Sequence, residues 1–249
     1  MSTTSVASLE NRPRVGVILV ACFIGFLAGQ ILALLLLEIG TLVTNYAGGL
    51  NALEKAANPP WWANALGLLG LWVGFVAAIF YAHREGHLRA LPHQWRPRPS
   101  DLIFVVLGVL CQFGVDLLYA PFHLKNLNKP VNHLFYSAHG LGFVVVALMT
   151  ALGAPFFEEW FFRGVIFRSI TEGASSLSPR TALWLGVVAS AVLFGLAHGE
   201  LVQFAGLALL GVVLALVVHR TKRLVPSFLT HASFNSTALV ALIIHRAGH

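Results

Sequence analysis

The chain has 249 residues, of which 57% are hydrophobic and only 10% are charged, and its formal net charge is +6. This composition excludes an ordinary soluble domain, because apolar runs long enough to cross a bilayer recur along the chain. The basic residues lie mainly in short loops beside these runs, where membrane topology and attraction to anionic lipid explain them, so no nucleic-acid partner is expected. Cys22 and Cys111 both fall inside apolar runs, which predicts packing roles for them rather than a disulfide.

The apolar runs predict an all-α fold, a polytopic transmembrane helix bundle of about seven spans. In chain order the spans are expected at 15–37, 63–81, 102–119, 140–170, 181–198, 201–218 and 227–244. The first run is too long for a signal peptide and has no clear cleavage site, so we expect it to remain uncleaved. An eighth crossing would follow if the long fourth span were two helices.

The loop after the second span is the most basic part of the chain, with Arg84, Arg89, Arg96 and Arg98. Cytoplasmic loops carry an excess of Lys and Arg, so this loop predicts a cytoplasmic N-terminus. We expect an integral membrane protein, located in the plasma membrane. The basic cluster at 220–223 favours seven spans over eight.

The third span carries Gln112 and Asp116 four residues apart, which places both side chains on one helical face. An acid inside a membrane span is by default a candidate for function. Asp116 lies near the far end of its span, however, where it could also simply reach water.

The fourth span contains the most costly residues of the chain, Glu158, Glu159 and Arg163. Each charge at the centre of a membrane helix costs about 2.5 to 3.5 kcal/mol. Glu159 and Arg163 stand four apart and are expected to pair. Glu158 points in another direction and has no partner within its own turn, which favours a functional role. Pro155 is expected to bend the helix or to free a carbonyl group just before the glutamates.

The fifth and seventh spans add imidazoles and an amide. Phe194 and His198 stand four apart near the end of the fifth span, where the ring of Phe194 would orient the imidazole and keep it dry. His231 and Asn235 share one face of the seventh span. Carboxylates, imidazoles and an amide are the groups needed to activate water and to stabilise an oxyanion. Between these spans, Gly206 and Gly211 would permit close helix packing.

The expected boundaries create one conflict. His198 would lie about 25 Å along the fifth span, toward its outer end. His231 would lie only a turn or so from the cytoplasmic end of the seventh span. The two rings can meet only if the fifth span starts later and tilts, or if the boundaries are displaced by several residues.

Three patterns in this order, Glu158-Glu159-x-x-x-Arg163, Phe194-x-x-x-His198 and His231-x-x-x-Asn235, resemble the signature motifs of the CAAX-protease and bacteriocin-processing (CPBP, or Abi) family of intramembrane proteases. The resemblance covers about residues 140–244. It divides the chain into an N-terminal region of spans without motifs, 1–139, and a catalytic membrane core, 140–249.

The resemblance implies an intramembrane endopeptidase that hydrolyses a peptide bond in or beside the bilayer. Glu158 and His198 would activate water, and His231 and Asn235 would stabilise the oxyanion. Glu159 and Arg163 would support the site, with Phe194 behind the imidazole. A hydrophobic or lipidated peptide or protein is the expected substrate.

The resemblance leaves the cofactor open. A divalent metal such as zinc could be held by Glu158, His198 and His231, since members of the family are often named metalloproteases. The chain has no His-Glu-x-x-His motif, and a metal-free mechanism would use the same residues.

Two other functions fit the polar residues. One is a non-catalytic scaffold or partner subunit of the same fold, in which the motifs form only a structural network. The other is a proton-coupled transporter, which would predict inverted repeats and broken helices in both halves.

Overall fold

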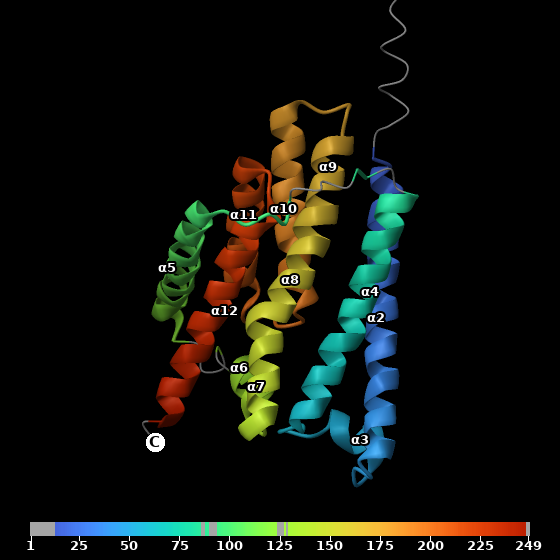
Figure 1. Ribbon diagram of the computed structural model, residues 1–249, viewed down its shortest axis with the longest axis vertical. Helices are drawn as coiled ribbons and strands as arrows, with labels where there is room; N and C mark the ends of the chain where they lie inside the picture. Colours follow the sequence, from blue (N-terminus) through green and yellow to red (C-terminus); the bar gives the residue numbers. More distant parts are fainter. Residues whose placement is uncertain (1–12, 86–87, 90–93, 124–126, 128, 248–249) are drawn as a thin grey trace, which may run out of the picture.

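The computed structural model describes residues 13–85, 88–89, 94–123, 127 and 129–247. All regular structure in these residues is helical, which confirms the predicted all-α class (Figure 1). Seven helices are long and apolar enough to cross a membrane: Val15–Val43, Trp61–Arg84, Pro99–Phe122, Gly140–Gly173, Pro179–Ala197, Phe204–Thr221 and Leu224–Arg246. The protein is therefore an integral membrane protein with seven candidate spans in its described part.

The first three spans are separated by short helices. In chain order, the spans and short helices of this part are α2 (Val15–Val43), α3 (Gly49–Glu54), α4 (Trp61–Arg84), η1 (Pro99–Leu102), α5 (Ile103–Tyr119), η2 (Ala120–Phe122) and α6 (Lys129–Phe135). The fourth span is one continuous rod made of α7 (Gly140–Leu148), η3 (Met149–Gly153), α8 (Ala154–Glu158), η4 (Glu159–Phe167) and α9 (Arg168–Gly173). Because this rod does not break into two crossings, an eighth span does not form there. The last spans are α10 (Pro179–Ala197), α11 (Phe204–Thr221) and α12 (Leu224–Ala247).

Helices α2 and α4 form a close pair through their glycines. A Cβ atom on Gly74 would lie 2.2 Å from the carbonyl oxygen of Gly25, and one on Gly70 would lie 2.4 Å from the backbone nitrogen of Ala33. Small residues let membrane helices approach until their backbones touch, and the contact then replaces lipid along the whole interface. Figure 1 shows the pair side by side at one edge of the bundle.

The fourth span runs through the middle of the bundle, between the α2–α4 pair and the group formed by α10, α11 and α12 (Figure 1). Aromatic rings join it to α4: the rings of Phe75 and Phe161 stack with centroids 4.1 Å apart, and those of Trp72 and Phe157 with centroids 4.6 Å apart. On the other side, a Cβ atom on Gly211 would lie 2.8 Å from Cα of Ala191, so α10 and α11 pack closely, as expected from the glycines of the sixth span.

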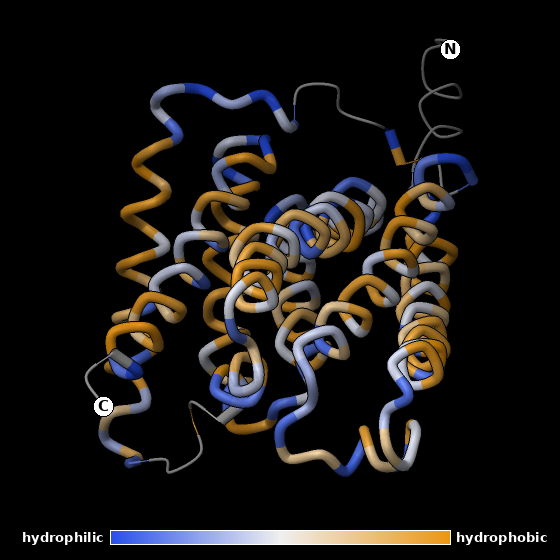
Figure 2. The backbone as a smooth tube through the Cα atoms, turned by 60° about the horizontal axis from the view of Figure 1, so that its bottom comes forward, coloured by the Kyte–Doolittle hydropathy of each residue, from blue (hydrophilic) through white to orange (hydrophobic). Residues whose placement is uncertain are grey.

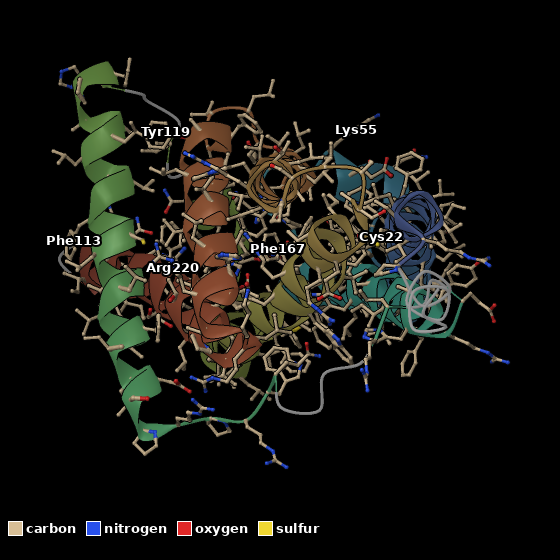
Figure 3. All side chains as sticks on the ribbon, turned by 90° about the horizontal axis from the view of Figure 1, so that it is seen from above. Cys22, Lys55, Phe113, Tyr119, Phe167 and Arg220 are labelled. Atoms are coloured by element: carbon tan, nitrogen blue, oxygen red, sulfur yellow. The ribbon has the colours of Figure 1, made fainter. Side chains whose placement is uncertain are left out.

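The outward faces of the spans are apolar, as lipid requires. Phe23 on α2 is 62% exposed and Leu117 on α5 is 74% exposed. Figure 2 shows hydrophobic colour along the helices and hydrophilic colour mainly in the connections. Figure 3 shows α2 almost end-on and α5 along much of its length, so α5 is strongly tilted, with Phe113 on its outer side. Cys22 is buried, Cys111 is partly buried, and both are free thiols, in line with packing roles.

The arginine-rich connection after α4 is bound to the end of the bundle. Arg223 forms an ion pair with Asp101, with 2.5 Å between Nη2 and Oδ1, and its Nη1 donates to the carbonyl oxygen of Arg96 at 3.0 Å. The hydrogen bond and charge of Asp101 raise the pKa of Arg223 above its ordinary value. The backbone nitrogen of Leu224 donates to the carbonyl oxygen of Gln94 at 2.8 Å, so this connection also caps the start of α12.

Candidate active site

Glu159 is fully buried and accepts three hydrogen bonds. Arg163 Nη1 lies 2.9 Å from Oε1, His231 Nδ1 lies 3.1 Å from the same oxygen, and the hydroxyl of Ser227 donates to Oε2. The pair of Glu159 and Arg163, four residues apart, is therefore formed as expected. Three donors replace the water that this carboxylate loses on burial, so it can stay ionised without contact with solvent.

Arg163 is also fully buried, and it uses its planar guanidinium in several directions. Besides Glu159, Nη2 donates to the carbonyl oxygen of Gly211 at 3.2 Å. Its Cζ atom lies 4.4 Å from the ring centroid of Phe194 and 5.9 Å from that of Phe162. Cation–π contact with two rings and a charged hydrogen bond compensate a cation that the bilayer would otherwise disfavour.

Glu158 faces the other nitrogen of the same imidazole. Its Oε2 lies 3.7 Å from Nε2 of His231, too far for a direct hydrogen bond, and this buried oxygen has no hydrogen-bond partner among the residues that the structure describes. The two neighbouring glutamates thus point in different directions, as expected, yet one imidazole contacts both. Two carboxylates and one guanidinium leave one negative charge unbalanced until a proton or a cation joins them.

His198 is held by its own helix. Its Nδ1 lies 2.8 Å from the carbonyl oxygen of Phe194, and the two rings meet edge to face with centroids 4.8 Å apart. A carbonyl oxygen only accepts, so Nδ1 carries the hydrogen. In the neutral ring, Nε2 then keeps its lone pair and can accept a proton or a hydrogen bond.

The rings of His198 and His231 both contact Phe194, with the centroid of His231 5.4 Å from that of Phe194. Both rings therefore lie within reach of one side chain, and the conflict between the expected boundaries does not arise, although the fifth span, Pro179–Ala197, stays close to its expected bounds of 181–198. The conflict had assumed that the fifth and seventh spans begin at one level. Figure 1 shows instead that α10 begins well above the start of α12, so the end of α10 reaches the depth of His231.

Asn235 donates a hydrogen bond to a backbone carbonyl group that has no helical donor because of Pro155. In η3 the backbone nitrogen of Ala154 donates to the carbonyl oxygen of Met149, five residues back, which is the π-helix register. In that register the next donor, for the carbonyl oxygen of Thr150, would be Pro155, which has no N–H. The side-chain nitrogen of Asn235 donates to Thr150 at 2.9 Å instead. The expectation that Pro155 frees a carbonyl group near the glutamates is thus met at Thr150.

A cavity of about 440 Å³ brings these groups together. Glu158, His198 and Asn235 line it, whereas His231, 2% exposed, lies behind Glu158 outside the lining. The cavity reaches α5, where Gln112 and Asp116 also line it and Gln112 Nε2 donates to Asp116 Oδ1 at 3.0 Å. The predicted polar face of the third span therefore lies on the wall of the same cavity. The rest of the wall is mainly apolar, including Leu71, Phe75, Leu134, Phe162, Leu207 and Phe234.

A comparison with family models identifies the family of the region that contains this site. Residues 140–237 match the model described as Rce1-like, type II CAAX prenyl endopeptidase. Residues 140–237 form a CPBP-family domain. The match covers all three patterns, from Glu158 to Asn235, and with them Glu159 and its three donors, Arg163, Ser227 and His231. Comparisons with curated proteins and with solved structures gave no match.

The donor set of the CPBP domain does not form a compact metal site. Glu158 and His231 approach each other, but no group of three His, Cys, Asp or Glu side chains gathers closely enough to hold a metal ion anywhere in the described residues. Glu158, His198 and His231, the set considered from the sequence, therefore do not gather as three ligands. The residues as placed do not fit the zinc site that the sequence left open.

Two residues of the CPBP domain that the sequence interpretation did not include contact the site. Ser227 donates to Glu159, and Thr150 accepts from Asn235. A signal for Ser227 exists, because it precedes His231 by four residues and Asn235 by eight, on the same face of α12. Thr150 contributes only its backbone carbonyl, which no side-chain pattern could reveal.

Proposed function

We propose that the chain is an intramembrane endopeptidase that hydrolyses a peptide bond in the cavity lined by Glu158, His198 and Asn235. The observation that supports this most is the unpaired oxygen of Glu158. A buried carboxylate oxygen without a hydrogen bond is costly, and here it belongs to a side chain on the wall of a cavity large enough for water and a peptide segment. Glu159, by contrast, has donors for both of its oxygens.

In this proposal, Glu158 takes a proton from a water molecule while the water oxygen bonds to the scissile carbonyl carbon. His198 Nε2 accepts a hydrogen bond from the other O–H of that water and so orients it. Asn235 uses one amide hydrogen on Thr150, and its second hydrogen is available to the developing oxyanion. When the C–N bond breaks, the proton held by Glu158 passes to the leaving nitrogen.

His231, Glu159 and Arg163 serve as positioning residues. His231 is almost fully buried and contacts both carboxylates, so we assign it to orienting Glu158 rather than to the oxyanion. Glu159 holds the Nδ1 hydrogen of His231, and Arg163 holds Glu159. In this series of contacts, the carboxylate of Glu159 fixes the tautomer and orientation of His231, as carboxylates do for histidines in other active sites.

The wall of the cavity and the family of its domain support a proposal for the substrate class. An apolar wall of this volume suits a hydrophobic peptide segment or a lipid chain attached to one. The printed description of the family is that of a CAAX prenyl endopeptidase, so we propose a hydrophobic or lipidated peptide as substrate. We also propose that the arginine-rich end of the bundle faces the cytoplasm, with the N-terminus, in the plasma membrane.

The test uses the full chain in proteoliposomes with two peptides, one ending in a prenylated Cys-a-a-X sequence and one identical but unlipidated. Glu158→Gln keeps the shape of the side chain and removes the base, so cleavage should fall by about 10² to 10⁴-fold. Glu38→Gln is the matched control, because Glu38 is exposed on α2 and does not line the cavity. A Glu158→Gln protein that cleaves like the wild type would overturn the proposal. Proton-linked flux lost on Glu158→Gln, with no cleavage of any peptide, would favour a transporter.

Orientation has its own test. A single cysteine at Ser176, between α9 and α10, and another at Asn58, between α3 and α4, mark opposite ends of the bundle. Both variants lack Cys22 and Cys111. A membrane-impermeant thiol reagent applied to intact cells should label the cysteine at 58 and not the one at 176. The reverse pattern would contradict the proposed orientation.

A further inference from the structure

A second cavity lies at the arginine-rich end of the bundle, among η4, α9, the start of α10 and the end of α11. It measures about 270 Å³ and shares no lining residue with the cavity of the candidate active site. Figure 3 looks down on this end, with Phe167 of the cavity wall labelled near the centre.

Cations outnumber anions on this wall. Arg168, Lys222 and Arg223 line it together with one acid, Glu172. Arg168 pairs with Glu172, with 2.8 Å between Nε and Oε1, and Arg223 pairs with Asp101 from outside the lining. After these two pairs, the charge of Lys222 remains. This side chain is exposed at the end of α11, and its Nζ lies 3.5 Å from Nδ1 of His219, a neutral acceptor in that contact.

The two arginines are buried and keep unused donors. Arg168 is 6% exposed and Arg223 is 8% exposed. Arg168 Nη2 donates to the carbonyl oxygen of Arg89 at 3.0 Å, whereas Nη1 has no acceptor in the described residues; Arg223 likewise leaves Nε without one. Buried N–H groups normally have partners, and a guanidinium offers them in a flat fork that matches phosphate and carboxylate oxygens.

The remaining wall is apolar and ends at the membrane boundary. Phe167, Leu183 and Val218 belong to the packed cluster of η4, α10 and α11, and they continue from the basic rim toward the interior. The start of α10 and the end of α11 are the ends of candidate spans, where lipid headgroups lie. Basic pockets between helix ends at such a boundary bind the phosphate groups of anionic lipids.

We propose that this cavity binds a phosphate-type anion, held by Lys222 and the unused donors of Arg168 and Arg223. The group can belong to the head of an anionic phospholipid or to a small soluble phosphate. This assignment is independent of proteolysis, because it is measured by binding and involves no residue of the catalytic cavity.

The experiment measures binding to the full chain after delipidation in detergent, by native mass spectrometry and by the shift in thermal unfolding. The probes are phosphatidylglycerol, glycerol phosphate, inorganic phosphate and phosphatidylcholine with the same acyl chains. Lys222→Asn removes one cation and suits the backbone, since residue 222 has φ of 57° and Asn tolerates the left-handed region. Arg220→Gln is the matched control. It removes one positive charge from the same helix end, but Arg220, labelled in Figure 3, does not line the cavity.

We expect phosphatidylglycerol or one of the soluble phosphates to bind the wild type, and Lys222→Asn to weaken that binding about fivefold. Arg220→Gln should leave it unchanged. Arg168→Gln, if it folds, should weaken binding further. Binding of phosphatidylglycerol alone identifies a lipid headgroup as the source, and equal binding of glycerol phosphate or inorganic phosphate identifies a soluble ligand. The inference is overturned if no probe binds, if phosphatidylcholine binds as tightly as phosphatidylglycerol, or if Lys222→Asn and Arg220→Gln have equal effects.

Discussion

The side-chain nitrogen of Asn235 lies 2.9 Å from the carbonyl oxygen of Thr150, the group that Pro155 leaves without a helical donor. Asn235, from the third motif, therefore supplies a missing hydrogen-bond donor to the backbone of the helix that carries the first motif. This contact ties α12 to the fourth span just before Glu158, and it gives Asn235 a structural role beside the chemical one proposed for it.

The contact predicts a coupling between Asn235 and Pro155. Asn235→Ala should lower the free energy of unfolding by about 1 to 3 kcal/mol, because it leaves a buried carbonyl unpaired. Pro155→Ala restores a backbone N–H that can reach Thr150. Asn235→Ala should therefore cost less in the Pro155→Ala background, as measured by a double-mutant cycle of unfolding in detergent. Strictly additive costs would show that the carbonyl of Thr150 does not link the two residues.

Ser227 is predicted to support the site without being essential for chemistry. Ser227→Ala removes one of three donors to Glu159, and a hydrogen bond to a charged group contributes about 1.5 to 3 kcal/mol. We expect a lower unfolding temperature and a reduced kcat, with cleavage still detectable. Ser236→Ala is the control, because within the described residues its hydroxyl donates only to the carbonyl oxygen of Ala232, in its own helix. Equal unfolding temperatures for the two variants would argue against the contact.

Variants of Arg163 and Glu159 should separate the contribution of this pair to the stability of the fold from its contribution to cleavage. Arg163→Met leaves Glu159 buried without its cation, which should cost about 3 to 5 kcal/mol. Adding Glu159→Leu removes the uncompensated carboxylate, so the double variant should regain part of that stability while cleavage stays low. The readouts are thermal unfolding and peptide cleavage on the same preparations. A double variant less stable than Arg163→Met would show that the pair itself stabilises the fold.

The close pair of α2 and α4 gives a test that is far from the site. Gly74→Ala places a Cβ atom 2.2 Å from the carbonyl oxygen of Gly25, so the helices must separate and the unfolding temperature should fall sharply. Gly67→Ala lies on the same helix with nothing within 4 Å of the new atom, and it should be neutral or stabilising by up to about 1 kcal/mol. Equal unfolding temperatures for the two variants would mean that α2 and α4 do not approach each other as closely as the glycine contacts indicate.

Chelation tests the absence of a metal step. No three ligands gather in the described part of the chain, and the proposed mechanism uses only Glu158, His198 and Asn235 on the substrate and water. Prolonged dialysis against a membrane-permeant chelator should therefore leave the rate of peptide cleavage unchanged. Loss of activity that returns on adding zinc would instead require His198 to move toward Glu158 and His231.

Hydropathy and the spacing of residues along each helix were sufficient to predict the spans of this protein and the side-chain pairs within them. Seven spans follow from the length of the apolar runs, and the pairs Glu159 with Arg163 and Gln112 with Asp116 follow from a separation of four residues. Both are local properties of a helix, in which neighbours along one face are fixed by its repeat. The close pairing of α2 and α4 also had a local signal, since Gly25 and Gly29, like Gly70 and Gly74, stand four apart in apolar spans.

The relations between helices were decided only by the tertiary structure. The higher start of α10 brings Phe194 to the ring of His231, and His231 contacts both glutamates because α12 lies against the fourth span at their level. The bond from Asn235 to Thr150 depends on a π register that the sequence marks only with Pro155. A sequence fixes which residues share a helical face, but how far one helix slides along another depends on side-chain packing over the whole bundle, and the site forms at that level.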